Sequence, residues 1–257
     1  MHLNVIRHGT RGNALPLLIV HGLFGSARNW GAIAKRLSDT REVWAVDMRN
    51  HGSSPWAESH GYDDMAADLA QVIADAGGRA DVVGHSMGGK AAMVLALTRP
   101  DLVNRMVVAD IAPATYSHSQ TPLIAAMRDL DLQGLSARSE ADRRLGTQVP
   151  DRAVRAFLLQ SLDLRADPPR WRLNLDVLQA EMDRIIGWPE IDGQFAGPTL
   201  FLAGADSDYI RTEHRAPIRA LFPAARFARI PGAGHWLHAD KPREFEAVLR
   251  AALPTEG

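Results

Sequence analysis

Short apolar runs alternate with segments of helical periodicity along the first 111 residues of the chain. Runs rich in Val, Ile, Leu and Ala predict buried strands at 16–20, 42–47, 81–85 and 103–109. Apolar side chains recur at helical spacing in the intervening segments 27–37, 62–76 and 87–98. In the second of these, Met65, Leu69 and Val72 fall on one face, and Gly77 ends the helix. This alternation predicts a parallel sheet with helices on both faces.

The alternation stops between residues 112 and 196, where no convincing strand is found. Helical segments separated by prolines are predicted there at 123–130, 139–145, 153–162 and 173–182. The strand–helix rhythm then returns, with strands at 198–203 and 226–230 and helices at 213–221 and 243–252. We therefore expect an α/β core domain formed by 1–111 and 197–257, with a helical cap at 112–196 inserted between strands. Trp171, Arg172 and Asn174 could line a pocket or hold this insertion to the core, and the second role is favoured.

Composition narrows the class of protein and its partners. A chain of 257 residues that is 46% hydrophobic can bury one sizeable core. A net charge of −1 and scattered arginines give no field that would attract nucleic acid or an anionic membrane. No run approaches the roughly 20 apolar residues of a membrane span, and no signal peptide is visible. The chain has no cysteine, which excludes disulfides and thiolate metal sites. We expect a cytoplasmic monomer or homodimer without a nucleic-acid or membrane partner.

A candidate nucleophile lies between the predicted strand 81–85 and the predicted helix 87–98. The sequence there is Gly84-His85-Ser86-Met87-Gly88, which is the Gly-x-Ser-x-Gly pattern. A strand before the motif and a helix after it are the context of a nucleophile elbow, in which the serine occupies a strained turn. The two glycines allow the strand and the helix to approach closely. The sequence therefore predicts a catalytic serine at position 86.

A serine hydroxyl needs a base to take its proton, and His235 is the candidate. It follows the last predicted strand in the glycine-rich loop Gly232-Ala233-Gly234, which can turn the side chain back across the strand ends. His238 is expected to pack or to be solvated, and His85 and His21 are expected to be structural.

An oxyanion hole needs two backbone N–H donors near the serine. Met87, directly after the nucleophile, supplies one. The turn His21-Gly22-Leu23-Phe24 follows a strand and opens a helix, so it is the expected source of the second donor. Leu23 is the favoured residue there, and Phe24 is the alternative.

The acid that orients the histidine is open from the residues alone. Asp110 ends the strand 103–109, whereas Asp206 and Asp208 follow the strand 198–203. The carboxyl ends of parallel strands meet at one edge of a sheet, so either location could reach His235. Asp47 also ends a strand, but its polar turn is expected to be structural.

The chain resembles the α/β-hydrolase superfamily through His21-Gly22, Gly84 to Gly89 and Gly234-His235. Its motifs are most similar to those of the YbfF-like esterases and their eukaryotic relative, α/β-hydrolase domain-containing protein 11. The segments that carry this resemblance are 21–26, 47–52, 110–113, 171–174 and 232–239. Most of the superfamily has its acid at the position of Ser207, but the YbfF-like group has it at the position of Asp110. The resemblance therefore favours Asp110, with Ser207 adding a hydrogen bond to the pair.

The resulting expectation is a serine carboxylesterase that acts on a small acyl ester or on a thioester such as acyl-CoA, without metal or cofactor. A serine rather than an aspartate nucleophile disfavours haloalkane dehalogenases and epoxide hydrolases. Three alternatives remain open: a carbon–carbon bond hydrolase, a cofactor-free haloperoxidase-type perhydrolase, and a receptor that binds without turnover. Apolar residues of the cap and of the motif loops are expected to line the substrate pocket: Phe24, Leu123, Met127, Phe157, Trp188 and Trp236.

Overall fold

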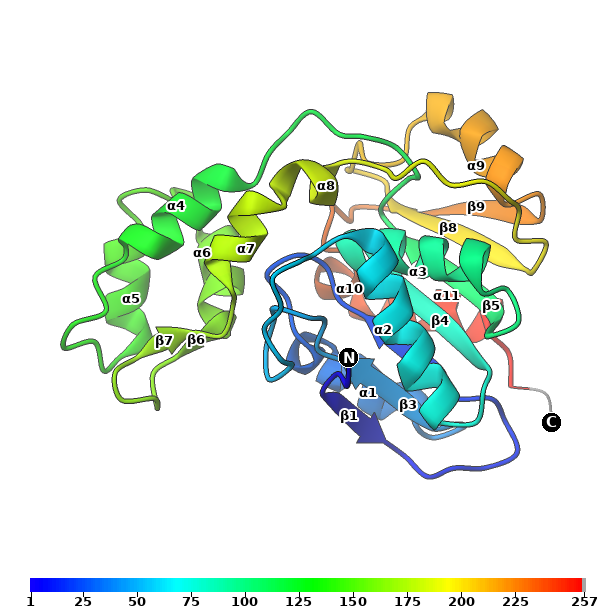
Figure 1. Cartoon of the computed structure of the whole chain (residues 1–257), viewed down its shortest axis with the longest axis horizontal. Helices are drawn as coiled ribbons and strands as arrows, with labels where there is room; N and C mark the ends of the chain where they lie inside the picture. The colour runs from blue at the N-terminus through cyan, green and yellow to red at the C-terminus, as the bar shows by residue number, and fades with distance from the viewer. Residues whose placement is uncertain (256–257) are drawn as a thin grey trace.

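The computed structural model describes residues 1–255 and is built around one seven-stranded sheet (Figure 1). The order in the sheet is β1-β3-β2-β4-β5-β8-β9, and every neighbouring pair is parallel except β1 with β3. The predicted parallel strands are confirmed, and β1 is an additional antiparallel edge strand. The strands are β1 Val5–His8, β2 Leu17–Val20, β3 Val43–Val46, β4 Ala80–His85, β5 Val103–Ala109, β8 Thr199–Gly204 and β9 Ala225–Ile230.

Helices cover both faces of this sheet, as the alternation predicted (Figure 1). Successive residues of a strand point to opposite faces, so Leu17 and Ile19 pack in one hydrophobic cluster while Leu18 and Val20 pack in the other. The first cluster contains α1 Gly31–Leu37, α10 Leu237–Asp240 and α11 Pro242–Ala252. The second contains α2 Tyr62–Asp75, α3 Met87–Thr98 and α9 Arg215–Leu221. The sheet is therefore the middle layer of three.

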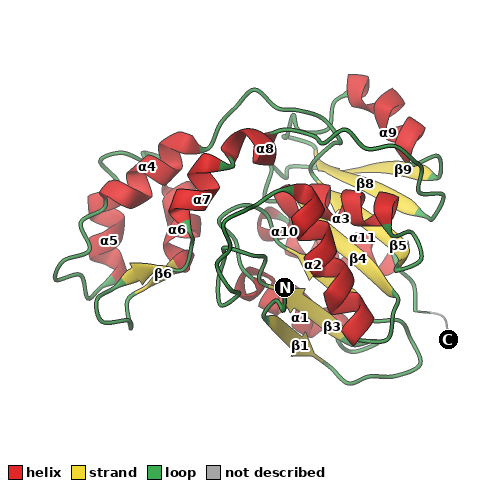
Figure 2. Ribbon diagram, viewed as in Figure 1, coloured by secondary structure: helices red, strands yellow, loops and turns green. Residues whose placement is uncertain are grey.

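The segment between β5 and β8 forms a group of helices beside the sheet, at the left of Figure 1. We call residues 112–196 the cap insertion. Figure 2 shows that its regular elements, which are joined by loops, are helices apart from one short ladder. Its elements are α4 Thr121–Asp129, α5 Arg138–Leu145, α6 Arg152–Leu158, β6 Leu162–Asp163, β7 Arg170–Trp171, α7 Leu175–Ala180 and α8 Met182–Ile186.

Several elements differ in detail from the sequence prediction. The expected helix 27–37 begins with a 3₁₀ turn over Ala27–Trp30, and Leu159–Ser161 and Thr212–His214 are also 3₁₀ turns. The expected helix 173–182 is two helices, because Asn174 caps α7 and the chain turns at Glu181 before α8. The two-residue strands β6 and β7 were missed because they are too short to show an alternating pattern. Within residues 1–255, no helix is long and apolar enough to cross a membrane.

Candidate active site

The turn between β4 and α3 holds Ser86 in a strained backbone conformation. Its φ is 53° and its ψ is −122°, a backbone conformation that residues other than glycine rarely adopt. Such a residue costs on the order of 1–3 kcal/mol and persists only where surrounding contacts hold it. Here the N–H of Ser86 donates to Ala109 O at 3.0 Å, and Ser86 O accepts from the N–H of Gly89 at 2.8 Å. The serine is therefore fixed between its neighbouring strand β5 and the first turn of α3.

The two glycines of the motif allow this close approach of strand and helix. A Cβ on Gly84 would lie 2.4 Å from Gly88 O, and a Cβ on Gly88 would lie 2.4 Å from His21 O. Because both obstacles are backbone atoms, a side chain at either position would push α3 away from the sheet.

His235 and Asp110 complete a hydrogen-bonded line that begins at Ser86. His235 Nε2 lies 3.1 Å from Ser86 Oγ, and His235 Nδ1 lies 2.8 Å from Asp110 Oδ2. A carboxylate only accepts hydrogen bonds, so Nδ1 carries the proton and Nε2 is left to accept one from the serine hydroxyl. The structure thus brings together the three side chains that the sequence placed after β4, β5 and β9.

Asp110 is fully buried, and its carboxylate accepts three hydrogen bonds from protein groups. Oδ1 accepts from the N–H of Gly204 at 3.0 Å, while Oδ2 accepts from Ser207 Oγ at 2.5 Å as well as from His235. The alternative acids are not brought to the histidine. Asp206 is exposed, and Asp208 is also exposed and pairs with Arg211 at 2.8 Å, which lowers the pKa of Asp208.

Aromatic rings and a second histidine restrict the position of His235. The ring of Tyr209 stacks on it with centroids 3.9 Å apart and planes 18° apart. His85 holds the backbone of the same residue, because its Nε2 donates to His235 O at 2.9 Å. This bond requires a proton on Nε2 of His85. Burial lowers the pKa of His85 well below its usual value, so the neutral form is present at neutral pH. His238 stacks on Trp30, in agreement with the expected packing role.

The expected oxyanion donors lie at the same place. Leu23 and Met87 both line the cavity in front of Ser86, and their N–H groups have no acceptor in the part of the chain that the structure describes. The alternative donor is already bonded, because the N–H of Phe24 donates to His51 Nε2 at 3.2 Å. Two residues that line the cavity beside Ser86 therefore each have an unbonded N–H, as an oxyanion hole requires.

A cavity of about 290 Å³ opens above Ser86, between the strand ends and the cap insertion. Four of the six side chains expected to line it do so: Phe24, Leu123, Phe157 and Trp236. Further apolar lining residues come from the cap insertion, namely Val154, Leu158, Ile185 and Ile186.

The expectation for the other two side chains was wrong. Met127 is one helical turn beyond Leu123 and is fully buried in the core of the cap insertion, where its carbonyl accepts from Trp171 Nε1 at 2.7 Å. Trp188 is half-buried against the larger hydrophobic cluster, outside the cavity lining, and its N–H donates to Thr115 Oγ1. Apolar periodicity could not distinguish a cap residue that faces the cavity from one that faces its neighbours.

Lys90 is a cavity residue that the sequence analysis missed. It is the one charged side chain on the otherwise apolar helix α3, a signal that could have marked it. Its Nζ donates to Ile186 O at 2.9 Å and to Gly187 O at 2.5 Å, and lies 4.9 Å from the ring centre of Tyr116. Burial lowers the pKa of Lys90 to about 7. The residue thus joins the nucleophile helix to the end of α8.

Within residues 1–255, no group of three or more His, Cys, Asp or Glu side chains is arranged to hold a metal ion.

Comparison with known proteins shows which family the chain is similar to. A sequence profile described as "alpha/beta hydrolase fold" matches residues 16–242. The chain is 42% identical over 244 residues to the sn-1-specific diacylglycerol lipase ABHD11 of Danio rerio, covering 91% of this chain and 77% of that protein. It is 38% identical over 241 residues to the esterase YbfF of Escherichia coli K12, covering 93% and 92% of the two chains.

A solved structure described as a marine microorganism esterase has the same architecture. It superposes with a TM-score of 0.93 at 37% sequence identity, and the match covers 98% of this chain and 99% of that one. The likeness therefore includes the cap insertion as well as the sheet. These relatives are the group that the motifs predicted.

Proposed function

Because the chain belongs to the α/β-hydrolase family and is of its esterase and lipase type, we propose that it is a serine carboxylesterase. Ser86 is the nucleophile, His235 the general base and acid, and Asp110 the residue that orients the histidine. The observation that carries this proposal is the line of hydrogen bonds from Ser86 Oγ through His235 to Asp110, at 3.1 and 2.8 Å.

The reaction has two steps, and in each the histidine moves one proton. In the first, His235 Nε2 takes the proton of Ser86, and Oγ bonds to the ester carbonyl carbon. The oxygen of the tetrahedral intermediate carries the negative charge towards the N–H groups of Leu23 and Met87. The bond to the leaving oxygen then breaks, and that oxygen takes the proton from His235. In the second step water replaces the leaving alcohol, and the acyl-enzyme is hydrolysed by the reverse proton transfers.

The size and the apolar lining of the cavity favour esters of short or medium acyl chains. Its volume of about 290 Å³ is just below the usual range for ligand pockets, roughly 300–1,000 Å³. Apolar side chains of α4, α6 and α8 lie opposite Ser86, where an acyl chain would have to lie. Thioesters fit the same chemistry, because only the leaving atom changes.

Hydrolysis of p-nitrophenyl esters with two to sixteen acyl carbons tests the proposal, with Ser86→Ala as the control. We expect turnover that is lost in the variant and declines for the longest chains. Parallel assays with acyl-CoA separate ester from thioester preference. Absence of turnover above the variant at every length would contradict the esterase, and vinylogous diketones and peroxide-dependent bromination would then test the alternative reactions.

A further inference from the structure

The backbone of Phe24 is held from two sides by segments far away in the sequence. Its φ is 63°, another left-handed conformation at a residue that is not glycine. Its N–H donates to His51 Nε2 at 3.2 Å, and its carbonyl accepts from Ser161 Oγ at 2.8 Å. His51 belongs to the loop after β3, whereas Ser161 belongs to the cap insertion. Core and cap thus hold opposite ends of the residue that follows the oxyanion donor Leu23.

The hydrogen bond from Phe24 to His51 needs one particular form of the imidazole. His51 Nδ1 lies 2.9 Å from Arg49 O, an acceptor, so Nδ1 carries the proton and Nε2 has a free lone pair. The imidazole of His51 is fully buried, and burial lowers its pKa well below the usual value. The nearby side chains of His21 and His60 lower this pKa further. The neutral acceptor is therefore the form present at neutral pH.

His51 and Ser161, which both bond to Phe24, are also connected to each other. Hydrogen bonds and short stretches of chain together form a closed ring, as follows. Ser161 O accepts from the N–H of Arg172 at 2.8 Å, and Arg172 O accepts from the N–H of Gly52 at 2.8 Å. Gly52 follows His51 in the chain, and His51 itself forms a β-bridge with Leu173. The ring therefore runs from the oxyanion turn to the cap ladder, on to the loop after β3, and back to the oxyanion turn.

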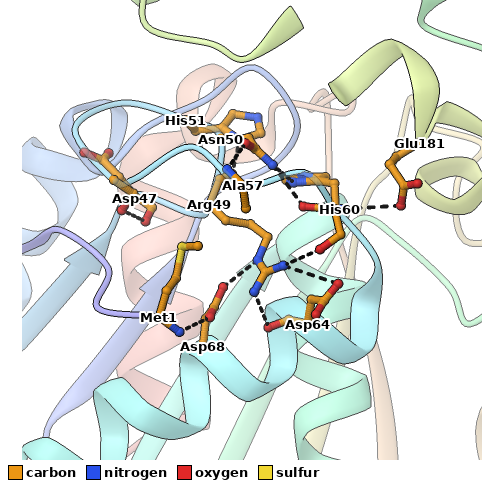
Figure 3. A network of polar contacts seen from close by, with 12 residues as sticks. Met1, Asp47, Arg49, Asn50, His51, Ala57, His60, Asp64, Asp68 and Glu181 are labelled. Carbon is orange, nitrogen blue, oxygen red and sulfur yellow. Dashed lines mark hydrogen bonds and ion pairs between the residues drawn. The ribbon is translucent and has the colours of Figure 1, made fainter. Parts of the chain in front are cut away.

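The loop after β3 is in turn fixed to the core. Figure 3 shows Arg49 bonded to Asp64 and Asp68, with Asn50 and His51 above it. Asn50 Oδ1 accepts from the N–H of Ala57 at 2.8 Å and from Asn174 Nδ2 at 3.0 Å. Asn174 belongs to the cap insertion, so this second contact also joins the cap to the loop. The ring is thus anchored to α2 as well as to the cap ladder.

We propose that Ser161 and His51 are positioning residues for the oxyanion hole, and that the cap insertion orders the hole through them. The inference rests on the proposed esterase function. The bond to His51 fixes the peptide plane between Leu23 and Phe24, and the bond from Ser161 fixes the next plane, between Phe24 and Gly25. The N–H of Leu23 lies in the plane directly before these two. The donor matters most when the acyl oxygen becomes negative, so a looser turn weakens the transition state more than substrate binding. The expected signature is a lower kcat at a nearly constant KM.

Ser161→Ala tests the cap side of the ring. We expect kcat to fall about threefold to tenfold, the effect of one hydrogen bond, while KM changes less than about twofold. The Phe24 amide should exchange its hydrogen faster, as measured by NMR. Ser161→Thr restores the hydroxyl and should recover both values, and Ser136→Ala, an exposed serine of the cap insertion, should change neither.

His51→Gln and His51→Leu test the core side. The glutamine oxygen can accept the Phe24 N–H in place of Nε2, whereas leucine leaves that buried donor without a partner. We expect faster Phe24 exchange and a lower kcat in His51→Leu, with partial recovery in His51→Gln. Thermal unfolding of each variant verifies that it is folded.

The outcomes separate this inference from the function on which it rests. An active wild type with an unchanged kcat in Ser161→Ala would overturn the role of the ring and leave the esterase intact. A lower kcat with unchanged Phe24 exchange would overturn it as well. A wild type without esterase activity would contradict the proposed function, and the exchange rates alone would then support or overturn the ring.

Discussion

Replacing Asp110 with asparagine tests the proposed acid at a single atom. The two carboxylate oxygens serve different donors: Oδ1 accepts from the N–H of Gly204, and Oδ2 accepts from His235 and Ser207. An asparagine must keep its oxygen towards Gly204, because that peptide N–H can only donate. Its NH₂ group then faces His235 Nδ1.

The consequence is the wrong imidazole tautomer. With a donor in front of Nδ1, that nitrogen must accept, so the proton moves to Nε2, which can no longer take the proton of Ser86. Ser207 can adapt, since a hydroxyl rotates and accepts as well as donates. In a Ser-His-Asp triad this error lowers turnover about 10⁴-fold, or roughly 5.5 kcal/mol of transition-state stabilisation.

The assay is kcat/KM on p-nitrophenyl butyrate for wild type, Asp110→Asn and the matched control Asp208→Asn. The Asp208 side chain is 75% exposed and pairs with Arg211, so we expect its variant to stay within about twofold of wild type. Circular dichroism should show that both variants are folded. Turnover above about a tenth of wild type in Asp110→Asn, or a hundredfold loss in Asp208→Asn, would refute the reasoning from the tautomer.

Two further predictions concern the glycine turn and Lys90. Gly88→Ala should lower the free energy of unfolding by about 3 kcal/mol, because its Cβ would lie 2.4 Å from His21 O, whereas Gly12→Ala, with nothing within 4 Å, should change it by less than about 0.5 kcal/mol. Equal melting temperatures of the two variants would contradict this. Because burial lowers the pKa of Lys90 from 10.5 to about 7, the unfolded chain binds more protons than the folded one between these values, so stability should rise with pH there by at most about 5 kcal/mol. Chemical denaturation from pH 7 to 10.5 should show this rise in wild type and a smaller one in Lys90→Met, and parallel curves would refute it.

Most of the sheet could be predicted because its signals are local. The boundaries of α3 and β5 were predicted to the residue, since the Gly-x-Ser-x-Gly turn and Pro100 mark them in the chain. Strand β1 was missed because a short, partly exposed edge strand carries little apolar signal. The cap insertion was predicted as helical, but its cavity face was predicted only in part, since apolar residues such as Leu123, which lines the cavity, and Met127, which is buried inside the cap, carry the same signal in the sequence.

The site shows a similar division between local and distant information. The motifs predicted where Ser86 and His235 lie, but the residues alone left the acid open, because Asp110 and Asp208 both follow strands that end at the same edge. Distance in space decided which of them meets the histidine. The roles of Ser161 and His51 depend on partners 137 and 27 residues away, and no spacing rule could have paired them with Phe24.

Backbone strain connects these observations. In residues 1–255, left-handed φ values at residues other than glycine occur at Phe24, Asn50, Ser86 and Asp110. They follow β2, β3, β4 and β5, which are neighbours in the sheet, so the strain is concentrated along one edge. Glycine at these positions would relieve on the order of 1 kcal/mol each, but it would remove the side chain. Ser86 and Asp110 supply the proposed chemistry, and Asn50 holds Asn174 of the cap insertion. The backbone of Phe24 is bonded to His51 of the core and to Ser161 of the cap insertion. Under the proposal above, its strained conformation links the position of the cap insertion to the geometry of the oxyanion hole.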